Sequence, residues 1–386
     1  MGRYFTYDGL LEENEICNLE KERETIWKHV QNGDCIKIFG KRNYGKTSLV
    51  KNVIAKRWTK SSEDHLVLYV DFYSVTSLDN ISFEMSKAFN KVFSMKRNLL
   101  EKGVDWFKYL KNIKPIYDFS TDGSSMGQLS FKSSLDKKIV DFDEVIENIG
   151  ILFKKNRFKF LVVFDEFQEI AKVQQAEAKF RDALQNLPTT IPVIIMGSKF
   201  HILNEIFNKL KAPFHSWGVT VEFSEIDYQD YHEYIMERFE KVHINLSFED
   251  SKYLQDLLSR NPEAINKFCD FIAICREGES FDKALINSSM MAYLENTSSI
   301  FSEMYASFSE SEKKVLNALA IKHCEKNILG VDFIESVGGV SKTGIKKIVE
   351  RLLDHSVLTR TELSGELCYS ITDPLLQLFI KYFKAS

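Results

Sequence analysis

Two short segments of this sequence combine the residue types that bind phosphate groups and divalent cations. The first, residues 40–47, reads Gly-Lys-Arg-Asn-Tyr-Gly-Lys-Thr and matches the pattern G-x-x-x-x-G-K-[ST]. Gly40 and Gly45 let backbone N–H groups turn toward phosphates, because no side chain blocks the close approach. Lys46 can reach the β- and γ-phosphates, and the Thr47 hydroxyl can ligate Mg²⁺. The segment therefore predicts a site for a nucleoside triphosphate.

The flanking residues support this prediction. Residues 35–39 read as a buried strand and residues 48–55 as a helix, so the phosphates would lie at a helix N-terminus with its dipole and free amides. The sequence contains no Asn-Lys-x-Asp segment, which reads guanine in GTPases, and adenine is therefore the expected base. The further loop positions expected to contact ATP are Lys41, Arg42, Asn43, Tyr44 and Ser48.

The second segment is an apolar run that ends in two carboxylates. Residues 159–164 precede Asp165 and Glu166, as in a central parallel strand whose C-terminal end faces a ligand. Asp165 is expected to hold Mg²⁺ together with Thr47, because a hard cation prefers oxygen ligands. Glu166 is placed to act as general base toward the attacking water. We therefore predict an ATPase that uses Mg²⁺, with Glu166 and Lys46 as its catalytic residues.

Strand-like and helix-like runs alternate through the first 225 residues and predict an α/β core with a doubly wound parallel sheet. Residues 114–138 are rich in Ser, Gly and Asp, which indicates a hairpin or a flexible insertion. Ser198 follows a buried run at residues 192–197; it is expected either to sense the γ-phosphate or to cap the next helix. The expected strands are residues 35–39, 66–71, 159–165, 192–198 and 219–223.

From residue 228 onward the pattern predicts helices, and three of them would form a lid that moves with nucleotide state. Three more helices, at residues 309–321, 331–337 and 341–353, precede a hairpin in the order of a winged helix-turn-helix. We therefore predict three domains. They are a P-loop core at 1–225 with an insertion at about 114–138, a helical lid at 226–303 and a winged helix at 304–386.

The third helix of the predicted winged helix carries Lys342, Lys346, Lys347 and Arg351, which could meet phosphates or bases in a major groove. Residues 307–386 contain eleven Lys and Arg against ten Asp and Glu, so charge gives little support for DNA. Winged helices also serve as protein-interaction modules. DNA and a protein partner both stay open.

Composition narrows the class of protein further. The net charge of −4 creates no overall field that would recruit nucleic acid or a membrane. No apolar stretch reaches the roughly 18 residues of a membrane span, and the N-terminus does not resemble a signal peptide. Cytoplasm is the expected location. The six cysteines are scattered without a C-x-x-C pair, so we expect them to be reduced and to form neither disulfides nor a zinc site.

The sequence resembles the archaeal-type ATPases, a family of the signal-transducing STAND branch of the AAA+ class. The resemblance rests on residues 38–49, 162–168 and 369–376 and extends over nearly the whole chain. It implies a switch operated by ATP and Mg²⁺, in which nucleotide state controls domain arrangement and often self-association into a homo-oligomer. It places phosphate contacts at residues 40–48, metal coordination at Thr47 and Asp165, and water activation at Glu166.

Two positions depart from this family. Its members commonly have an aromatic-Gly-Arg segment before the last core strand, whereas residues 213–219 contain no arginine. Arg260-Asn261-Pro262 stands where the lid usually has Gly-x-Pro. Since arginine can stabilise charge on a transferred phosphoryl group, turnover is expected to be slow unless Arg181 or Arg260 substitutes. The alternative is a slow or degenerate ATPase that acts as a nucleotide-locked scaffold or a DNA-binding regulator, as in a defence or toxin system.

Overall fold

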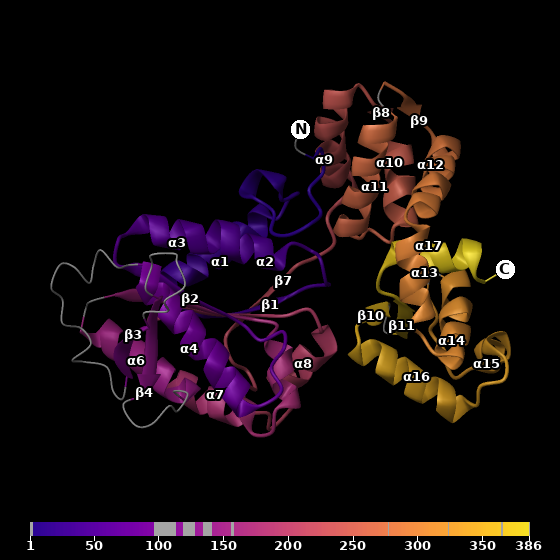
Figure 1. The fold of residues 1–386 in the computed structure, drawn as a ribbon. Helices are drawn as coiled ribbons and strands as arrows, with labels where there is room; N and C mark the ends of the chain where they lie inside the picture. The colour runs from indigo at the N-terminus through magenta and orange to yellow at the C-terminus, as the bar shows by residue number, and fades with distance from the viewer. Residues whose placement is uncertain are drawn as a thin grey trace. The chain divides into compact units, whose positions relative to one another are not determined.

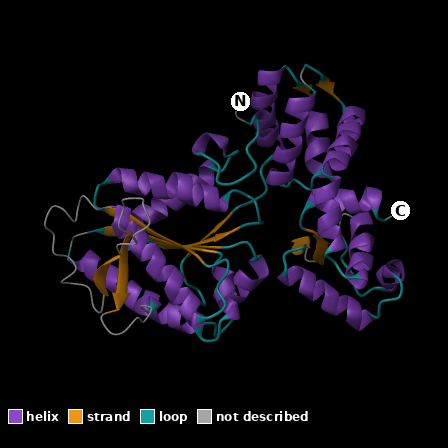
Figure 2. Cartoon of the chain, in the orientation of Figure 1, coloured by secondary structure: helices purple, strands orange, loops and turns teal. Residues whose placement is uncertain are grey.

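The computed structural model contains two compact units. One comprises residues 9–225, and the other comprises residues 1–8 together with residues 226–386. Figure 1 labels their elements, and Figure 2 shows that the large sheet belongs to the first unit while the second is mainly helical. The structure describes residues 3–95, 113–118, 128–133, 141–155, 158–276, 278–322, 324–363 and 366–385.

A five-stranded parallel sheet forms the centre of the 9–225 unit. All five predicted strands are present, with ends within two residues of the predicted ones, and the α/β class is confirmed. The continuous apolar sequence of the inner strands reflects burial on both faces. In spatial order the strands are β2 His65–Asp71, β5 Lys159–Asp165, β6 Val193–Met196, β1 Cys35–Phe39 and β7 Val219–Glu222.

Helices cover both faces of this sheet, each over its own apolar core (Figure 1). One face carries α1 Glu20–Asn32 and a helical run made of α2 Lys46–Ser48, the π-helical segment η2 Leu49–Ala55 and α3 Lys56–Ser61. This arrangement confirms the doubly wound sheet. The other face carries α4 Leu78–Met95, α6 Phe142–Lys154, α7 Ala176–Gln185 and α8 Phe200–Asn208.

The stretch predicted as a hairpin or flexible insertion contains two paired strands. β3 Ile113–Asp118 and β4 Gln128–Ser133 run antiparallel, so the hairpin alternative is confirmed for these residues. The rest of the predicted insertion lies outside the described residues.

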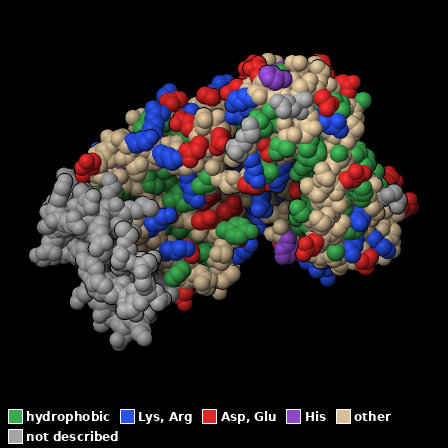
Figure 3. Space-filling view, turned by 45° about the horizontal axis from the view of Figure 1, so that its top comes forward, with side chains coloured by type: hydrophobic (Ala, Val, Ile, Leu, Met, Phe, Trp, Pro, Cys, Tyr) green, Lys and Arg blue, Asp and Glu red, His purple; other side chains and the backbone are tan. Residues whose placement is uncertain are grey.

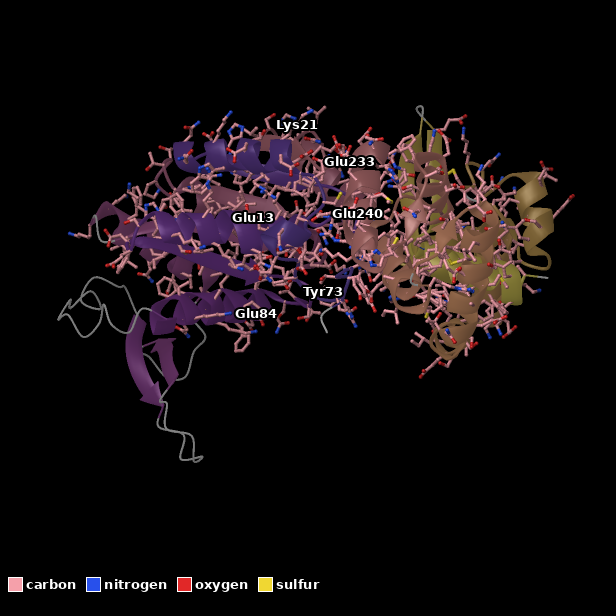
Figure 4. All side chains as sticks on the ribbon, turned by 90° about the horizontal axis from the view of Figure 1, so that it is seen from above. Glu13, Lys21, Tyr73, Glu84, Glu233 and Glu240 are labelled. Atoms are coloured by element: carbon pink, nitrogen blue, oxygen red, sulfur yellow. A yellow bond between two sulfur atoms is a disulfide. The ribbon has the colours of Figure 1, made fainter. Side chains whose placement is uncertain are left out.

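The first part of the second unit is a group of helices joined by a short two-strand pair, β8 Asn245–Leu246 and β9 Ser280–Phe281. In α9 the buried residues recur every three or four positions, while Glu233 lies exposed (Figure 4), as in an amphipathic helix. The helices are α9 Tyr228–Phe239, η5 Glu240–Val242, α10 Phe248–Leu257, α11 Pro262–Cys275, α12 Lys283–Asn296 and α13 Ser298–Ala306.

The N-terminal residues are bound to these helices. Phe5 is fully buried, with its ring centroid 5.4 Å from that of Phe239, and the backbone N–H groups of Tyr4 and Phe5 donate to the Asp270 carboxylate at 3.0 and 3.1 Å. Residues 3–8 therefore pack with α9 and α11. The predicted boundaries of three domains stay a prediction.

The C-terminal part has the predicted order of three helices and a hairpin. α17 was not predicted, although Pro374 at its first turn and the Asp373 side chain, which accepts from the N–H of Leu375 at 2.9 Å, are ordinary start signals of a helix. The elements are α14 Glu310–Ile321, α15 Val331–Val337, α16 Lys342–Asp354, β10 Leu358–Leu363, β11 Glu366–Ile371 and α17 Pro374–Phe383.

The cysteines differ from the expectation that all six are reduced. Cys324 and Cys368 form a disulfide, with Cα atoms 5.6 Å apart. Cys324 reaches β11 because its neighbour Glu325 forms a backbone bridge with Tyr369, in which each N–H donates to the other carbonyl at 3.0 Å. The sequence did not indicate this pairing, because the two cysteines are 44 positions apart. The other four cysteines are free thiols.

Candidate active site

The loop between β1 and α2 brings the predicted phosphate-binding residues to the carboxyl end of the sheet. Gly45 has a φ of 77°, in the left-handed region that glycine adopts without steric cost. A Cβ atom at Gly40 would lie 2.8 Å from the Cβ of Phe223, so the close approach of these two segments requires a glycine. The sequence thus has glycines where the loop conformation needs them.

The Lys46 side chain is folded into this loop. Its ammonium donates to the carbonyl oxygens of Gly40 and Lys41, at 2.8 and 2.6 Å. Burial lowers the pKa of Lys46 to about 8, although the charges of Glu166 and Asp165 oppose this shift. The Lys46 ammonium thus lies between two carbonyl oxygens, and phosphate oxygens could replace them as its hydrogen-bond acceptors.

Asp165 joins three elements at the end of β5. Its Oδ2 accepts hydrogen bonds from the Thr47 hydroxyl at 3.0 Å and from the Tyr69 hydroxyl, and its Oδ1 accepts from the N–H of Glu166 at 2.9 Å. Burial raises the pKa of Asp165 above its ordinary value, while the hydrogen bonds from Tyr69 and Thr47 lower it. The carboxylate is therefore held in one orientation.

Thr47 and Asp165 together fit a divalent cation. Both offer hard oxygen donors, and these lie 3.0 Å apart beside the phosphate-binding loop. Within the described ranges, no group of three or more His, Cys, Asp and Glu side chains could form a metal cage. This pattern suits Mg²⁺, which is usually bound by one or two protein oxygens, water and substrate phosphates.

Glu166 turns out of the strand into a second hydrogen-bonded cluster. Its φ of 50° lies in the left-handed region, which is uncommon for a residue other than glycine. Its Oε2 accepts from the Ser198 hydroxyl at 3.0 Å and from the side-chain amide of Gln168. The N-cap position of α8 is Lys199, so the alternative that Ser198 caps this helix is wrong.

Aromatic packing anchors the turn that carries the two acids. Phe164 and Phe167 flank Asp165 and Glu166 in the sequence, and the ring centroids of both lie within 5.6 Å of that of Phe180 on α7. All three rings are fully buried. Packing of these rings in the apolar core therefore fixes the turn after β5 and limits the positions of the two carboxylates.

The other predicted loop contacts differ in exposure and partners. Lys41, Arg42 and Asn43 are exposed, whereas Tyr44 is buried. Lys41 pairs with Glu225 at the end of this unit. The Ser48 hydroxyl accepts a hydrogen bond from the N–H of Leu11 at 3.1 Å, so it binds the segment that precedes α1.

Two contacts of the acids, Tyr69 and Gln168, were not singled out from the sequence. Tyr69 of β2 pairs with Val163 of β5, and Val163 lies two residues before Asp165. Because side chains along a strand point alternately to the two faces of the sheet, Tyr69 and Asp165 lie on the same face. That inference needs the strand order. Gln168 lies in the short 3-10 helix η4 Phe167–Lys172, where the sequence pattern does not show which way a side chain points.

The arginines considered as substitutes have other contacts. Arg181 donates to the carbonyl of Pro213 at 3.1 Å, and Arg260 donates to the carbonyl of Ile226. Arg260 has a φ of 52°, a backbone conformation that glycine adopts without steric cost, and it stands where the resembling family usually has glycine. Val219, the last residue of the stretch that has no arginine, pairs with Ile36, four residues before Gly40. It therefore lies about 13 Å along the strand from the loop.

The basic face predicted on α16 is partly neutralised. Arg351 pairs with Glu312 of α14, and the ammonium of Lys346 lies 3.9 Å from the Glu350 carboxylate. Lys342 and Lys347 are exposed. On the face shown in Figure 3, positive and negative side chains are interspersed, in keeping with the near-equal counts.

A parallel sheet of this strand order, with a glycine loop after β1 and two acids after β5, defines a P-loop ATPase fold, here followed by a C-terminal winged helix. The family model described as "Probable winged helix domain" matches residues 299–382. A Walker-type ATPase of Pyrococcus abyssi has a similar structure, with a TM-score of 0.63 and 16% identity over 98% of this chain and 99% of that one.

Two proteins of Methanocaldococcus jannaschii are similar in sequence: MJ0801 and MJ0147, both named uncharacterized ATP-binding proteins. Each is 25% identical, over 174 and 142 residues respectively. These matches cover 43% and 35% of this chain, and only 40% and 34% of the relatives' own lengths. Together the comparisons confirm the resemblance to archaeal P-loop ATPases with a C-terminal winged helix. Among the described residues, no helix is long and apolar enough to cross a membrane.

Proposed function

We propose that this protein is a cytoplasmic ATPase of the STAND branch of the AAA+ class, which uses Mg²⁺ and changes state with its nucleotide. The observation that carries the proposal is the convergence of Lys46, Thr47, Asp165 and Glu166 at the carboxyl end of the sheet. Thr47 bonds directly to Asp165, and the charges of both acids act on Lys46. A cation, a hydroxyl and two carboxylates in this arrangement suit phosphoryl transfer to water.

Each residue has a role in this proposal. Lys46 leaves the carbonyls of Gly40 and Lys41 to bind phosphate oxygens, and the backbone of residues 40–48 surrounds them. Thr47 and Asp165 would hold Mg²⁺, which would neutralise charge on the phosphates. Ser198 stands next to Glu166, where a hydroxyl could respond to the γ-phosphate.

Glu166 would activate the attacking water. Its Oε2 is occupied by Ser198 and Gln168, whereas its Oε1 has no hydrogen-bond partner among the described residues. That oxygen can accept the proton as the water oxygen bonds to the γ-phosphorus and the bond to ADP breaks. The products are ADP and inorganic phosphate.

The binding step is tested by calorimetric titration of ATP and GTP into the 386-residue protein. ATP is expected to bind more tightly than GTP, and Lys46→Ala to weaken ATP binding at least 10-fold. Lys60→Ala is the matched control, because Lys60 is an exposed lysine on the same helical run. Equal ATP affinity in Lys46→Ala and Lys60→Ala would contradict the assignment of the loop.

A nucleotide-locked scaffold, or a DNA-binding regulator, is the second candidate. Val219 in place of arginine, and the engagement of Arg181 by Pro213, support slow turnover. In either case we propose that the winged helix binds DNA or a protein partner, with Lys342 and Lys347 as phosphate contacts if the partner is DNA. Self-association that depends on nucleotide belongs to the same proposal.

A further inference from the structure

Gln168 has a buried amide group that is only half satisfied. The residue is 1% exposed, and its Nε2 donates to Oε2 of Glu166. Its Oε1 has no hydrogen-bond partner among the described residues. Because a carboxylate only accepts hydrogen bonds, the nitrogen of the amide must face Glu166. A buried carbonyl without a partner disfavours the fold, so apolar packing alone does not explain a glutamine here.

Gly197 creates the space in which this amide lies. A Cβ atom at Gly197 would fall 1.8 Å from Oε1 of Gln168 and 3.0 Å from its Cδ. The φ of Gly197 lies outside the positive range, so the backbone itself does not demand glycine. The glycine before Ser198 is thus required by the position of the Gln168 side chain.

Both donors act on the same oxygen of Glu166. Ser198 and Gln168 approach Oε2 from two different elements, the segment after β6 and η4. Two bonds from separate elements fix the rotation of the carboxylate and leave Oε1 facing away from them. Glu166 itself lies between β5 and η4, outside both elements, with a φ of 50°.

We propose that Gln168 is a positioning residue for Glu166, whose amide orients the carboxylate so that only Oε1 meets the attacking water. This inference rests on the ATPase activity proposed above. Gln168 does not touch the nucleotide in this account, so its loss affects turnover and leaves ATP binding unchanged. Gly197 supports Gln168 by leaving room for it.

The decisive variant is Gln168→Met, which keeps the length of the side chain but removes the donor and the unsatisfied carbonyl. We expect kcat for ATP to fall about 10- to 100-fold, as for a misoriented general base, with KM and ATP affinity unchanged. The melting temperature should stay the same or rise, because the buried carbonyl without a partner is gone. Gln174→Met, on an exposed residue six positions away, is the control and should change nothing.

Gly197→Ala tests the same geometry with Gln168 intact. The added methyl group must displace the amide, so kcat should fall as in Gln168→Met. A double-mutant cycle then asks whether Gln168 acts through Glu166. In a Glu166→Gln background, Gln168→Met should leave the residual rate unchanged, since there is no longer a carboxylate to orient.

The outcomes separate this inference from the proposal on which it rests. Wild-type turnover with an unchanged kcat in Gln168→Met would overturn the positioning role alone. A lower kcat accompanied by a lower melting temperature, with a further loss in the Glu166→Gln background, would overturn it in favour of a purely structural role. No turnover in the wild type would overturn both.

Discussion

At the scale of single residues, hydrogen bonds fix the charged groups of the site. Lys46 donates to two carbonyls of its own loop, and Asp165 accepts from Thr47 and Tyr69. The types and spacing of Lys46, Thr47 and Asp165 were evident from the sequence because they lie in contiguous motifs. Tyr69 was not, because it lies 96 positions from Asp165 and meets it only through the pairing of β2 with β5.

ATP binding should take up a proton at alkaline pH. Burial lowers the pKa of Lys46 to about 8, so at about pH 9.5 most free protein carries a neutral Lys46, and bound phosphate would restore its charge. At pH 7 the lysine is already protonated and no uptake is expected. Calorimetry in buffers of different ionisation enthalpy, with EDTA present, measures the proton count. An equal count at both pH values would show that Lys46 does not respond to the phosphate.

Tyr69→Phe should raise the Mg²⁺ requirement. The variant removes only the hydroxyl that orients the Asp165 carboxylate, and the loss of such a partner of a metal ligand weakens metal affinity about 10-fold. The Mg²⁺ concentration at half-maximal ATP turnover is the quantity to measure, together with ATP affinity in EDTA, which should not change. An unaltered Mg²⁺ midpoint would mean that Thr47 and the N–H of Glu166 suffice to hold Asp165.

At the scale of elements, the strands and most helices followed from local patterns, because continuous apolar runs mark the inner strands and the start signals of helices lie within a few positions of each other. β1 and the inner strand β5 were both predicted with the bounds that the structure has. What local patterns could not show is which elements meet. The disulfide between Cys324 and Cys368, and the pairing of Arg351 with Glu312, depend on how the winged helix closes.

Arg351 is expected to stabilise the winged helix, in contrast to the sequence-based view that it contacts DNA. The Glu312 carboxylate is buried and also accepts from the N–H of Ser309 at 2.8 Å as part of the N-terminal cap of α14. Arg351→Ala should therefore lower local stability by about 1–2 kcal/mol, whereas Lys347→Ala should change it by less than about 0.5 kcal/mol. Hydrogen exchange of the α14 and α16 amides measures this.

The same pair of variants separates structure from recognition. If DNA is the partner, Lys347→Ala should weaken binding and reduce the salt dependence by about one ion. If Arg351→Ala leaves the hydrogen exchange of the α14 and α16 amides unchanged but weakens DNA binding, Arg351 contacts DNA instead.

At the scale of the whole molecule, the chain combines a P-loop core with helices and a C-terminal winged helix, and its fold is similar to that of the Pyrococcus abyssi ATPase. Val219, at the end of the stretch that has no arginine, lies about 13 Å along the strand from the phosphate-binding loop. The site itself keeps Lys46 and Glu166 beside that loop.

ATP turnover by the 386-residue protein with Mg²⁺, with and without duplex DNA, is the most direct test of the proposed function. We expect measurable wild-type turnover, loss in Lys46→Ala, and at least a 100-fold decrease in Glu166→Gln with ATP binding retained. Lys60→Ala and Glu205→Gln, which alter exposed residues of the same types, should behave like the wild type. A wild-type protein that binds ATP but never turns it over, or a Glu166→Gln variant as active as the wild type, would contradict the central claim.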